Sequence, residues 1–96
     1  MFSIEYRYFY QAAKDLSIRK ASNNLNVNSS AVVRQIKKLE ANLDCKVFTR
    51  HTRGITLTKE GKFLFDYIDK TVESINEFYF NLKEQKNKIE GMINIG

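Results

Sequence analysis

The sequence predicts a mainly helical fold in which three short helices and a two-stranded hairpin, called the wing below, precede one long helix. Two short amphipathic segments flank the turn Asn26–Asn28, a pattern typical of a helix-turn-helix. Apolar and polar residues then alternate around Gly54, as they do in a β-hairpin. From Lys59 onward apolar residues recur every three or four positions, which indicates a single long helix.

The first helix is predicted from about Ser3 to Asp15. Aromatic side chains are dense in this segment and recur on one face of it. We interpret them as core and dimer contacts, because a protein that stacks bases on aromatic rings normally places those rings among cations. The aromatic residues are Phe2, Tyr6 and Phe9, which lie on one line of the helix with Ala13, and Tyr8 and Tyr10 beside that line.

The next two helices form the predicted helix-turn-helix. Ser17 can cap the first of them, and Asn28 can cap the second, because short polar side chains accept from free backbone N–H groups. The asparagines of the turn tolerate unusual backbone angles. Helical spacing predicts a buried face on each helix: Ile18, Ala21, Ser22 and Leu25 on the first, and Val32, Ile36, Leu39 and Leu43 on the second.

The second helix of the pair, at about 28–43, is predicted to be a recognition helix. Its exposed face carries short polar side chains and cations in the N-terminal half, where such a helix meets base edges and phosphates. An ordinary solvated face is the alternative, and the adjoining turn and basic wing favour recognition. We expect base contacts from Ser29, Ser30, Val33 and Arg34, and phosphate contacts from Ser17, Arg19, Arg34, Lys37 and Arg50, with Asn28 at the start of the helix.

The wing is predicted at about 46–57, with strands at Lys46–Thr49 and Ile55–Leu57. Gly54 supplies the backbone freedom of its turn. Arg53, at the tip, is the better candidate for a minor groove, whereas Arg50 can pair either with a carboxylate or with a phosphate. His51 has no neighbours that indicate catalysis or metal binding, so an exposed position is expected.

Positive charge is concentrated in the same region. Residues 34–62 contain eight Lys or Arg against three Asp or Glu, which accounts for the whole formal net charge of +5. The rest of the chain is balanced. A charge excess confined to the recognition helix, the wing and the start of the next helix is the pattern expected for binding a polyanion.

Several other classes of protein fit the sequence poorly. A chain of 96 residues is too short for an enzyme with a deep pocket, and it has no paired carboxylates, nucleophile beside a base, or phosphate-binding glycine loop. One Cys and one His make a zinc site implausible, so we expect no metal and no cofactor. Without an apolar run of membrane length or a signal peptide, we expect a cytoplasmic protein with no membrane partner. Cys45 is expected to pack between the recognition helix and the wing.

The long helix, at 59–90, should start at a cap formed by Thr58 and carry a seam for dimerisation. Apolar residues spaced alternately by four and three form a heptad pattern, and a small monomer has little else to cover them. Such a helix spans roughly 48 Å, enough to hold two binding heads apart on an interrupted palindrome. A helix that packs only on its own domain is the alternative. The predicted dimer residues are Ile68, Val72, Ile75, Tyr79 and Leu82.

These residues together resemble the LysR-type transcriptional regulators of bacteria, specifically their N-terminal winged helix-turn-helix and linker helix. The resemblance covers nearly the whole chain and rests on Tyr8-Phe9, Ala13, Ser17-Ile18, Ala21, Leu25, Val27, Gln35-Ile36, Leu39-Glu40, Leu43, Phe48, Arg50, Leu57-Thr58 and Gly61. It implies a sequence-specific DNA-binding homodimer, in some cases a tetramer, that controls transcription under a small-molecule effector. It further implies that residues 91–96 are a hinge and the first strand of an effector-binding domain absent from this sequence.

The chain departs from the family pattern where bases would be read. Ser29 stands in place of a glutamine and lacks the long amide that can pair with adenine. Val33 stands in place of a serine, and its methyl groups are better suited to contact with a thymine methyl. Leu16 and Asp44 stand where glycine is frequent. Two other functions remain open: a nonspecific architectural DNA-binding protein, and a protein-interaction module that uses the long helix.

Overall fold

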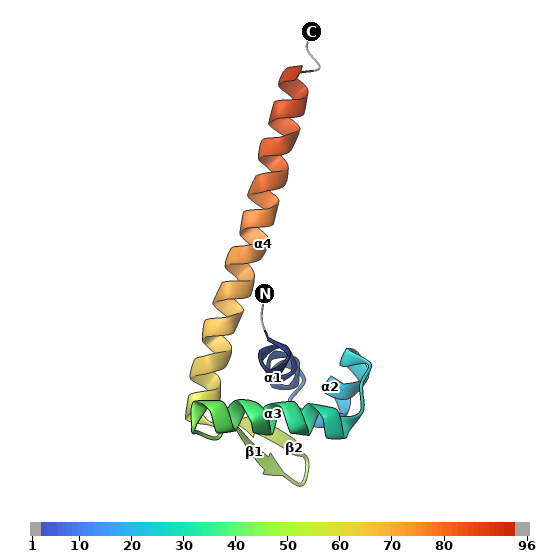
Figure 1. The fold of residues 1–96 in the computed structure, drawn as a ribbon, viewed down its shortest axis with the longest axis vertical. Helices are drawn as coiled ribbons and strands as arrows, with labels where there is room; N and C mark the ends of the chain where they lie inside the picture. The colour runs from blue at the N-terminus through green and yellow to red at the C-terminus, as the bar shows by residue number, and fades with distance from the viewer. Residues whose placement is uncertain (1–2, 94–96) are drawn as a thin grey trace. The chain divides into compact units, whose positions relative to one another are not determined.

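The structure, a computed structural model, describes residues 3–93, with side chains described up to residue 88. The chain divides into two compact units, the first ending at Asp66 and the second beginning at Tyr67, and each is described by itself. The elements are α1 (Ile4–Asp15), α2 (Ile18–Leu25), α3 (Ser29–Leu43), β1 (Phe48–His51), β2 (Gly54–Leu57) and α4 (Lys59–Ile93) (Figure 1). Three helices, a two-stranded wing and a long helix confirm the predicted fold class.

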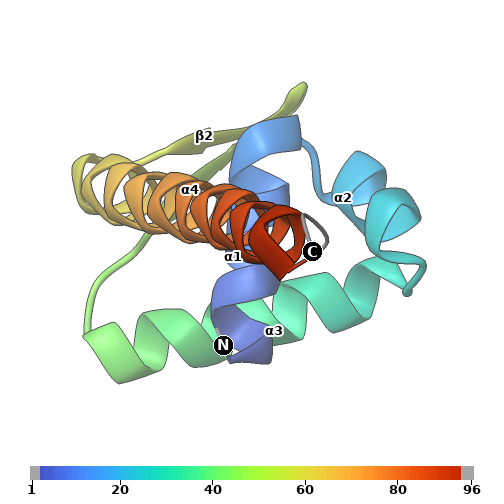
Figure 2. The same ribbon diagram turned by 90° about the horizontal axis from the view of Figure 1, so that it is seen from above.

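The core of the first unit lies where α1 packs against both α2 and α3 (Figure 2). Phe9 of α1 is fully buried, and its ring centroid lies 5.3 Å from that of Phe48 at the start of the wing. The other buried apolar residues of this unit are Ala12, Ala13, Ala21, Val32, Ile36, Leu39, Val47 and Ile55. The helical spacing therefore identified most of the core correctly.

Three of the predicted core residues are less buried than expected. Leu43 is 38% exposed, because it is the last residue of α3 and no further helical turn covers it. Ile18 and Leu25, at the two ends of the short helix α2, are partly buried. Burial in α2 and α3 thus concentrates at the middle of each helix.

Polar side chains fix how the helices meet. The Asp15 carboxylate accepts hydrogen bonds from Gln11 Nε2 and Asn24 Nδ2, both at 2.9 Å, and so joins the end of α1 to α2. These bonds, that from Gln11 above all, lower the pKa of Asp15. At the other end of α1, Glu5 accepts from Asn42 Nδ2 at 2.9 Å and thereby contacts α3.

The helix ends agree with the sequence at one cap and differ at another. The Ser17 hydroxyl accepts from the backbone N–H of Lys20 at 3.2 Å, as predicted. Asn28 occupies the cap position of α3, but its side chain makes no capping bond within residues 3–88. That prediction was wrong: the side chain is exposed to solvent, and the backbone carbonyl of Asn28 accepts the first helical bond from Ala31 at 3.0 Å.

All three short helices end in a residue with left-handed backbone angles: Leu16 (φ 50°), Asn26 (φ 60°) and Asp44 (φ 55°). Asparagine and aspartate visit this region several times more often than most residues, whereas a leucine is strained there. The carbonyl of Leu16 accepts from Ile55 N–H at 3.4 Å, so this strained residue also contacts the wing.

Leu16→Gly is expected to raise the free energy of unfolding by about 0.5–1 kcal/mol, because glycine adopts φ near +50° without strain. Leu16 is 47% exposed, so the loss of its side chain offsets only part of that gain. Urea unfolding measures the change. Asn26→Gly is the matched control and should change stability by only a few tenths of a kcal/mol; an equal gain in both variants would contradict the strain at Leu16.

The wing is antiparallel, but its first strand lies two residues later than predicted. Phe48 pairs with Leu57, Arg50 with Ile55 and His51 with Gly54. Val47 and Phe48 are both buried, which breaks the alternation expected of a strand and places Lys46–Val47 in a connecting segment. Arg50 and His51 therefore belong to β1, and Gly54 (φ 141°) closes the turn at the start of β2.

The helix α4 starts as predicted and runs further than predicted. Thr58 Oγ1 accepts from the backbone N–H of Gly61 at 3.0 Å, which confirms the cap. The helix continues through Gly91 to Ile93, where a hinge and the start of a strand were expected. That prediction was wrong for residues 91–93, whose backbone is helical. The remainder of the predicted strand, residues 94–96, lies outside the described residues.

Within the described residues, no helix is long and apolar enough to cross a membrane. The same part of the chain contains no group of three or more His, Cys, Asp or Glu side chains arranged to hold a metal ion.

Candidate nucleic-acid interface

The exposed face of α3 is the centre of the candidate interface. Of the ten predicted DNA-binding residues, Ser17 and Val33 are partly buried and the others are exposed. Those exposed are Arg19, Asn28, Ser29, Ser30, Arg34, Lys37, Arg50 and Arg53. The inward face of the same helix is occupied by Val32, Ile36 and Leu39. Burial of one face thus fixes which side chains α3 presents to solvent.

A pair of serine hydroxyls links the two helices of the helix-turn-helix. Ser22, which is 4% exposed on α2, donates from Oγ to the backbone carbonyl of Arg19 at 2.7 Å. Its oxygen also lies 3.1 Å from Oγ of Ser29, the first residue of α3. The sequence pattern identified Ser22 as a small buried residue but missed these two bonds, through which Ser22 connects Arg19 and Ser29, both predicted to contact DNA.

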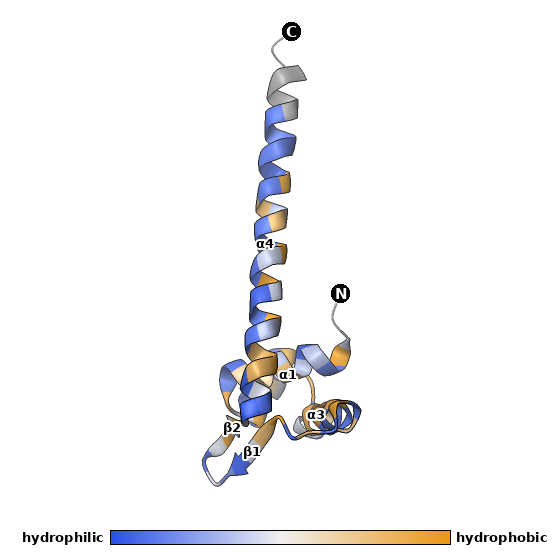
Figure 3. Ribbon diagram, turned by 90° about the vertical axis from the view of Figure 1, so that its left-hand side faces the viewer, coloured by the Kyte–Doolittle hydropathy of each residue, from blue (hydrophilic) through white to orange (hydrophobic). Residues whose placement is uncertain are grey.

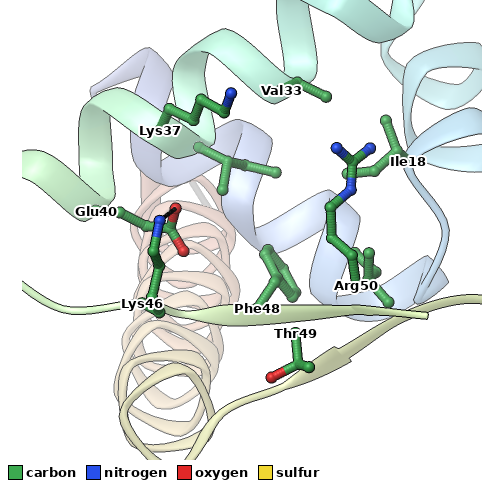
Figure 4. A pocket seen from close by; sticks show the side chains of 10 residues that line it. Ile18, Val33, Lys37, Glu40, Lys46, Phe48, Thr49 and Arg50 are labelled. Atoms are coloured by element: carbon green, nitrogen blue, oxygen red, sulfur yellow. Dashed lines mark ion pairs between the residues drawn. The ribbon is translucent and has the colours of Figure 1, made fainter.

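A groove of about 390 Å³ lies between α3 and the wing (Figure 4). Its apolar lining comes from both helices of the helix-turn-helix and from the wing: Ile18, Val33, Ile36, Phe48 and Ile55. The charged groups at its edge are Lys37 on α3, Arg50 on β1, and the pair Glu40 and Lys46. Cations thus border an apolar floor, a surface suited to sugar rings and phosphates of a nucleic-acid backbone.

Arg50 was predicted to pair with either a carboxylate or a phosphate. Among the described residues it forms no ion pair with a carboxylate, and its guanidinium points from β1 toward Ile18 and Val33 (Figure 4). The carboxylate of the groove, Glu40, pairs instead with Lys46 at 3.8 Å. No carboxylate of the described residues neutralises the Arg50 guanidinium, which can therefore bind an anionic ligand such as a phosphate.

Glu40 holds the segment that leads from α3 into the wing. Its Oε2 accepts from the backbone N–H of Val47 at 2.8 Å, and its Oε1 faces Lys46 Nζ. Val47 is fully buried, so this N–H has no access to water. Glu40 thereby determines how the wing is positioned relative to the recognition helix, a role that depends on a contact between residues seven apart and that the pattern did not predict.

Glu40→Ala is expected to lower the free energy of unfolding by about 1–3 kcal/mol, because it leaves the buried Val47 N–H without a partner. Glu40→Gln retains an oxygen that accepts the same bond and should cost less than about 1 kcal/mol. Urea unfolding of both variants separates the two contributions. Equal losses would show that the charge pair with Lys46, and not the bond to Val47, is what stabilises the connection.

The tip of the wing carries Arg53 in its turn, exposed as predicted. His51 Nε2 lies 2.8 Å from Thr56 Oγ1 across the two strands, so this exposed histidine has a hydrogen-bond partner within the wing. The bond joins the strands close to the turn. Arg53 is therefore presented at the end of a hairpin tied near its tip.

Three helices with an antiparallel wing, and a cationic exposed face on the second helix of the pair, define a winged helix-turn-helix domain. The sequence model of a protein family described as "bacterial regulatory helix-turn-helix protein, lysR family" matches residues 5–62 of the chain. The chain belongs to the LysR family. The resemblance inferred from the sequence is thus confirmed.

Two curated relatives illustrate the similarity. The transcriptional activator AmpR of Yersinia enterocolitica is 36% identical over 87 residues, covering 86% of this chain and 30% of AmpR. The transcriptional regulator GltR of Bacillus subtilis is 44% identical over 69 residues, covering 72% of this chain and 23% of GltR. The chain therefore spans less than a third of the length of these relatives.

Solved structures show the same fold bound to DNA. The DNA-binding domain of BenM in complex with catB site 1 DNA has a TM-score of 0.75 and 27% identity, over 88% of this chain and 93% of that one. Full-length CbnR complexed with its target DNA has a TM-score of 0.70 and 27% identity, over 80% of this chain and 27% of CbnR.

Proposed function

We propose that this chain is the DNA-binding part of a LysR-type transcriptional regulator, which acts in the cytoplasm on double-stranded DNA. The exposed polar and cationic face of α3 would enter the major groove, and Arg53 of the wing would reach an adjacent minor groove. The observation that carries the proposal is the match in fold and sequence to domains solved in complex with DNA.

The position of the positive charge supports the same proposal. The cations of the interface, Arg34 and Lys37 on α3 with Arg50 and Arg53 on the wing, are all exposed. Glu40, the acidic residue that lines the groove with Lys37 and Arg50, already accepts from the Val47 N–H and pairs with Lys46. The region between α3 and the wing is therefore available to phosphates, which dominate the affinity of such interfaces.

We further propose that two copies pair through α4 and bind an interrupted palindrome. Apolar residues recur among hydrophilic ones along this helix (Figure 3). Tyr79 and Leu82 are 59% and 44% exposed, and Val72 and Ile75 are partly exposed. Ile68, also predicted for the dimer, is 5% exposed in the single chain, so we leave it out of the proposed dimer surface. An effector site in a further domain, and a tetramer, stay predictions from the family resemblance.

The test is selection of duplexes from fragmented genomic DNA, followed by anisotropy titration of the enriched duplex and a scrambled one at one fixed salt concentration. A preference of about a thousandfold or more is expected for a sequence-specific regulator. Equal affinity for the two duplexes would indicate a nonspecific architectural protein. Absence of binding at physiological salt would indicate a protein-interaction module that uses α4.

Lys37→Ala is expected to reduce the slope of log affinity against log salt by about one, because each phosphate contact releases roughly one counterion. Lys38→Ala is the matched control: it removes the same charge from the adjacent residue, whose Nζ lies 3.8 Å from Glu5 of α1. Anisotropy titration over a salt series measures both slopes. An equal change in the two variants would assign the effect to net charge and remove Lys37 from the interface.

A further inference from the structure

We propose that Ser29 faces DNA as a hydrogen-bond acceptor only, and therefore selects an amino-bearing base, adenine or cytosine, at one position of each half-site. The inference rests on the proposed function, because it specifies what one residue of that interface recognises. It follows from the two hydrogen bonds that join Arg19, Ser22 and Ser29.

The direction of both hydrogen bonds is fixed by the groups that make them. Ser22 Oγ lies 2.7 Å from the carbonyl oxygen of Arg19, which can accept but not donate, so the single proton of Ser22 is committed there. Ser22 therefore has only lone pairs to offer Ser29 at 3.1 Å, and Ser29 must donate the second bond.

Burial keeps this arrangement in place. Ser22 is 4% exposed, so water does not offer its hydroxyl a competing acceptor. Ser29 is exposed at the first position of α3, with its proton directed inward to Ser22. Its remaining lone pairs are the hydrogen-bonding capacity that it presents to DNA.

The major-groove edges of the bases differ in the chemistry that an acceptor can use. The amino groups of adenine and cytosine donate hydrogen bonds, whereas thymine O4 and guanine O6 and N7 accept them. An acceptor-only Ser29 bonds to the first kind and is repelled by the second. Phosphate oxygens also only accept, so the same argument directs Ser29 to bases and not to the backbone.

Every base pair contains one base with an amino group in the major groove, adenine in A·T and cytosine in G·C. Ser29 would therefore distinguish the two orientations of a base pair, according to which strand carries the amino-bearing base. At the position it contacts, replacing A·T by C·G should preserve affinity, and replacing A·T by T·A should reduce it. This pattern differs from recognition of a single base by a long amide or guanidinium, which distinguishes adenine or guanine from all three alternatives.

The first experiment compares all four bases at every position of a duplex that the wild-type chain enriches from a random library. We expect one position in each half-site where amino-bearing bases bind about three to ten times more tightly than keto bases, the effect of one neutral hydrogen bond. Ser29→Ala should abolish that ratio. Ser74→Ala is the control: this exposed serine lies on α4, outside the interface, and its loss should leave the ratio unchanged.

The second experiment removes the amino group from the DNA. A purine without the 6-amino group in place of adenine, or a pyrimidinone without the 4-amino group in place of cytosine, should weaken wild-type binding by the same factor. The Ser29→Ala variant, in contrast, should bind the modified and the unmodified duplex with equal affinity. A purely structural role of Ser29 would not produce this coupling between a protein atom and a DNA atom.

Ser22→Ala tests the direction of the hydrogen bonds. The variant removes the acceptor of the Ser29 proton, so Ser29 can then donate, and keto bases should be tolerated at the same position; circular dichroism checks that the variant is folded. Two results would overturn the inference about Ser29 and leave the proposed function intact. One is a preference for amino-bearing bases that persists in the Ser29→Ala variant. The other is a wild-type preference for keto bases that is lost in the same variant. Failure of the wild-type chain to enrich any sequence would refute the proposed function as well.

Discussion

Gly61→Ala is expected to lower the free energy of unfolding by about 2–4 kcal/mol, although alanine normally stabilises a helix by roughly 1 kcal/mol relative to glycine. A Cβ atom at Gly61 would lie 2.0 Å from the carbonyl oxygen of Val47 and 2.9 Å from its carbonyl carbon. Both are backbone atoms, so no change of side-chain rotamer relieves the contact. The first turn of α4 would have to move away from the segment that precedes β1.

That movement would break further bonds at the same point. The Val47 carbonyl accepts from Thr58 N–H at 3.0 Å, and Thr58 Oγ1 donates to the Lys46 carbonyl at 2.6 Å while it caps α4. Together with Glu40, these contacts attach the connecting segment from both sides. The loss is large against the total stability of a small domain, about 5–15 kcal/mol.

Urea unfolding of the Gly61→Ala variant measures the loss. Lys62→Ala, an exposed position in the same turn of α4, is the control and should change stability by less than about 0.5 kcal/mol. A Gly61→Ala variant that is as stable as the wild type would show that α4 can begin at a distance from Val47, and would contradict the close approach.

Local patterns were enough to predict much of the fold. The buried face of α3 follows from the spacing of Val32, Ile36 and Leu39, and the left-handed end of α2 from an asparagine that tolerates it. The caps at Ser17 and Thr58 follow from a short hydroxyl side chain placed before a helical pattern. Each of these features depends on residues within a few positions of one another.

The features that the sequence did not predict depend on contacts between elements. The start of β1 is set by Glu40 on one side and Thr58 on the other, so the alternation of apolar residues in the wing placed the strand two residues early. The orientation of Ser29 is set by Ser22 and the Arg19 carbonyl across the turn. Leu16 adopts a left-handed conformation that its own propensity does not favour, at a position where glycine is frequent in the family.

The candidate interface divides in the same way. Exposure of Arg34 and Lys37 follows from the buried face of their own helix, so the sequence predicted it. The groove that brings Lys37 and Arg50 to one opening required the tertiary fold, because its lining comes from α2, α3 and both strands (Figure 4). Residue types could therefore identify candidates for DNA contact, but not which of them share a surface.

Arg34→Ala is expected to weaken specific DNA binding by about 1–3 kcal/mol and to relax the base preference at one position of each half-site. Arg34 is exposed on the same face of α3 as Ser30 and Lys37, in the half of the helix that enters the groove. A planar guanidinium can donate two bonds to O6 and N7 of one guanine, and alanine can donate none. Anisotropy titration against duplexes varied at every position measures both effects.

Arg34→Lys separates base recognition from charge. Lysine keeps the positive charge but lacks the fork of donors, so a bidentate contact with guanine should lose most of its preference while nonspecific affinity and salt slope are preserved. If Arg34 instead contacts a phosphate, lysine should restore nearly all of the affinity, and alanine should weaken every duplex equally. Arg7→Ala, which removes an exposed arginine from α1, controls for net charge and should leave the base preferences intact. A uniform loss in Arg34→Ala with full rescue by lysine would therefore move Arg34 from the bases to the backbone and leave the specificity of α3 to Ser29, Ser30 and Val33.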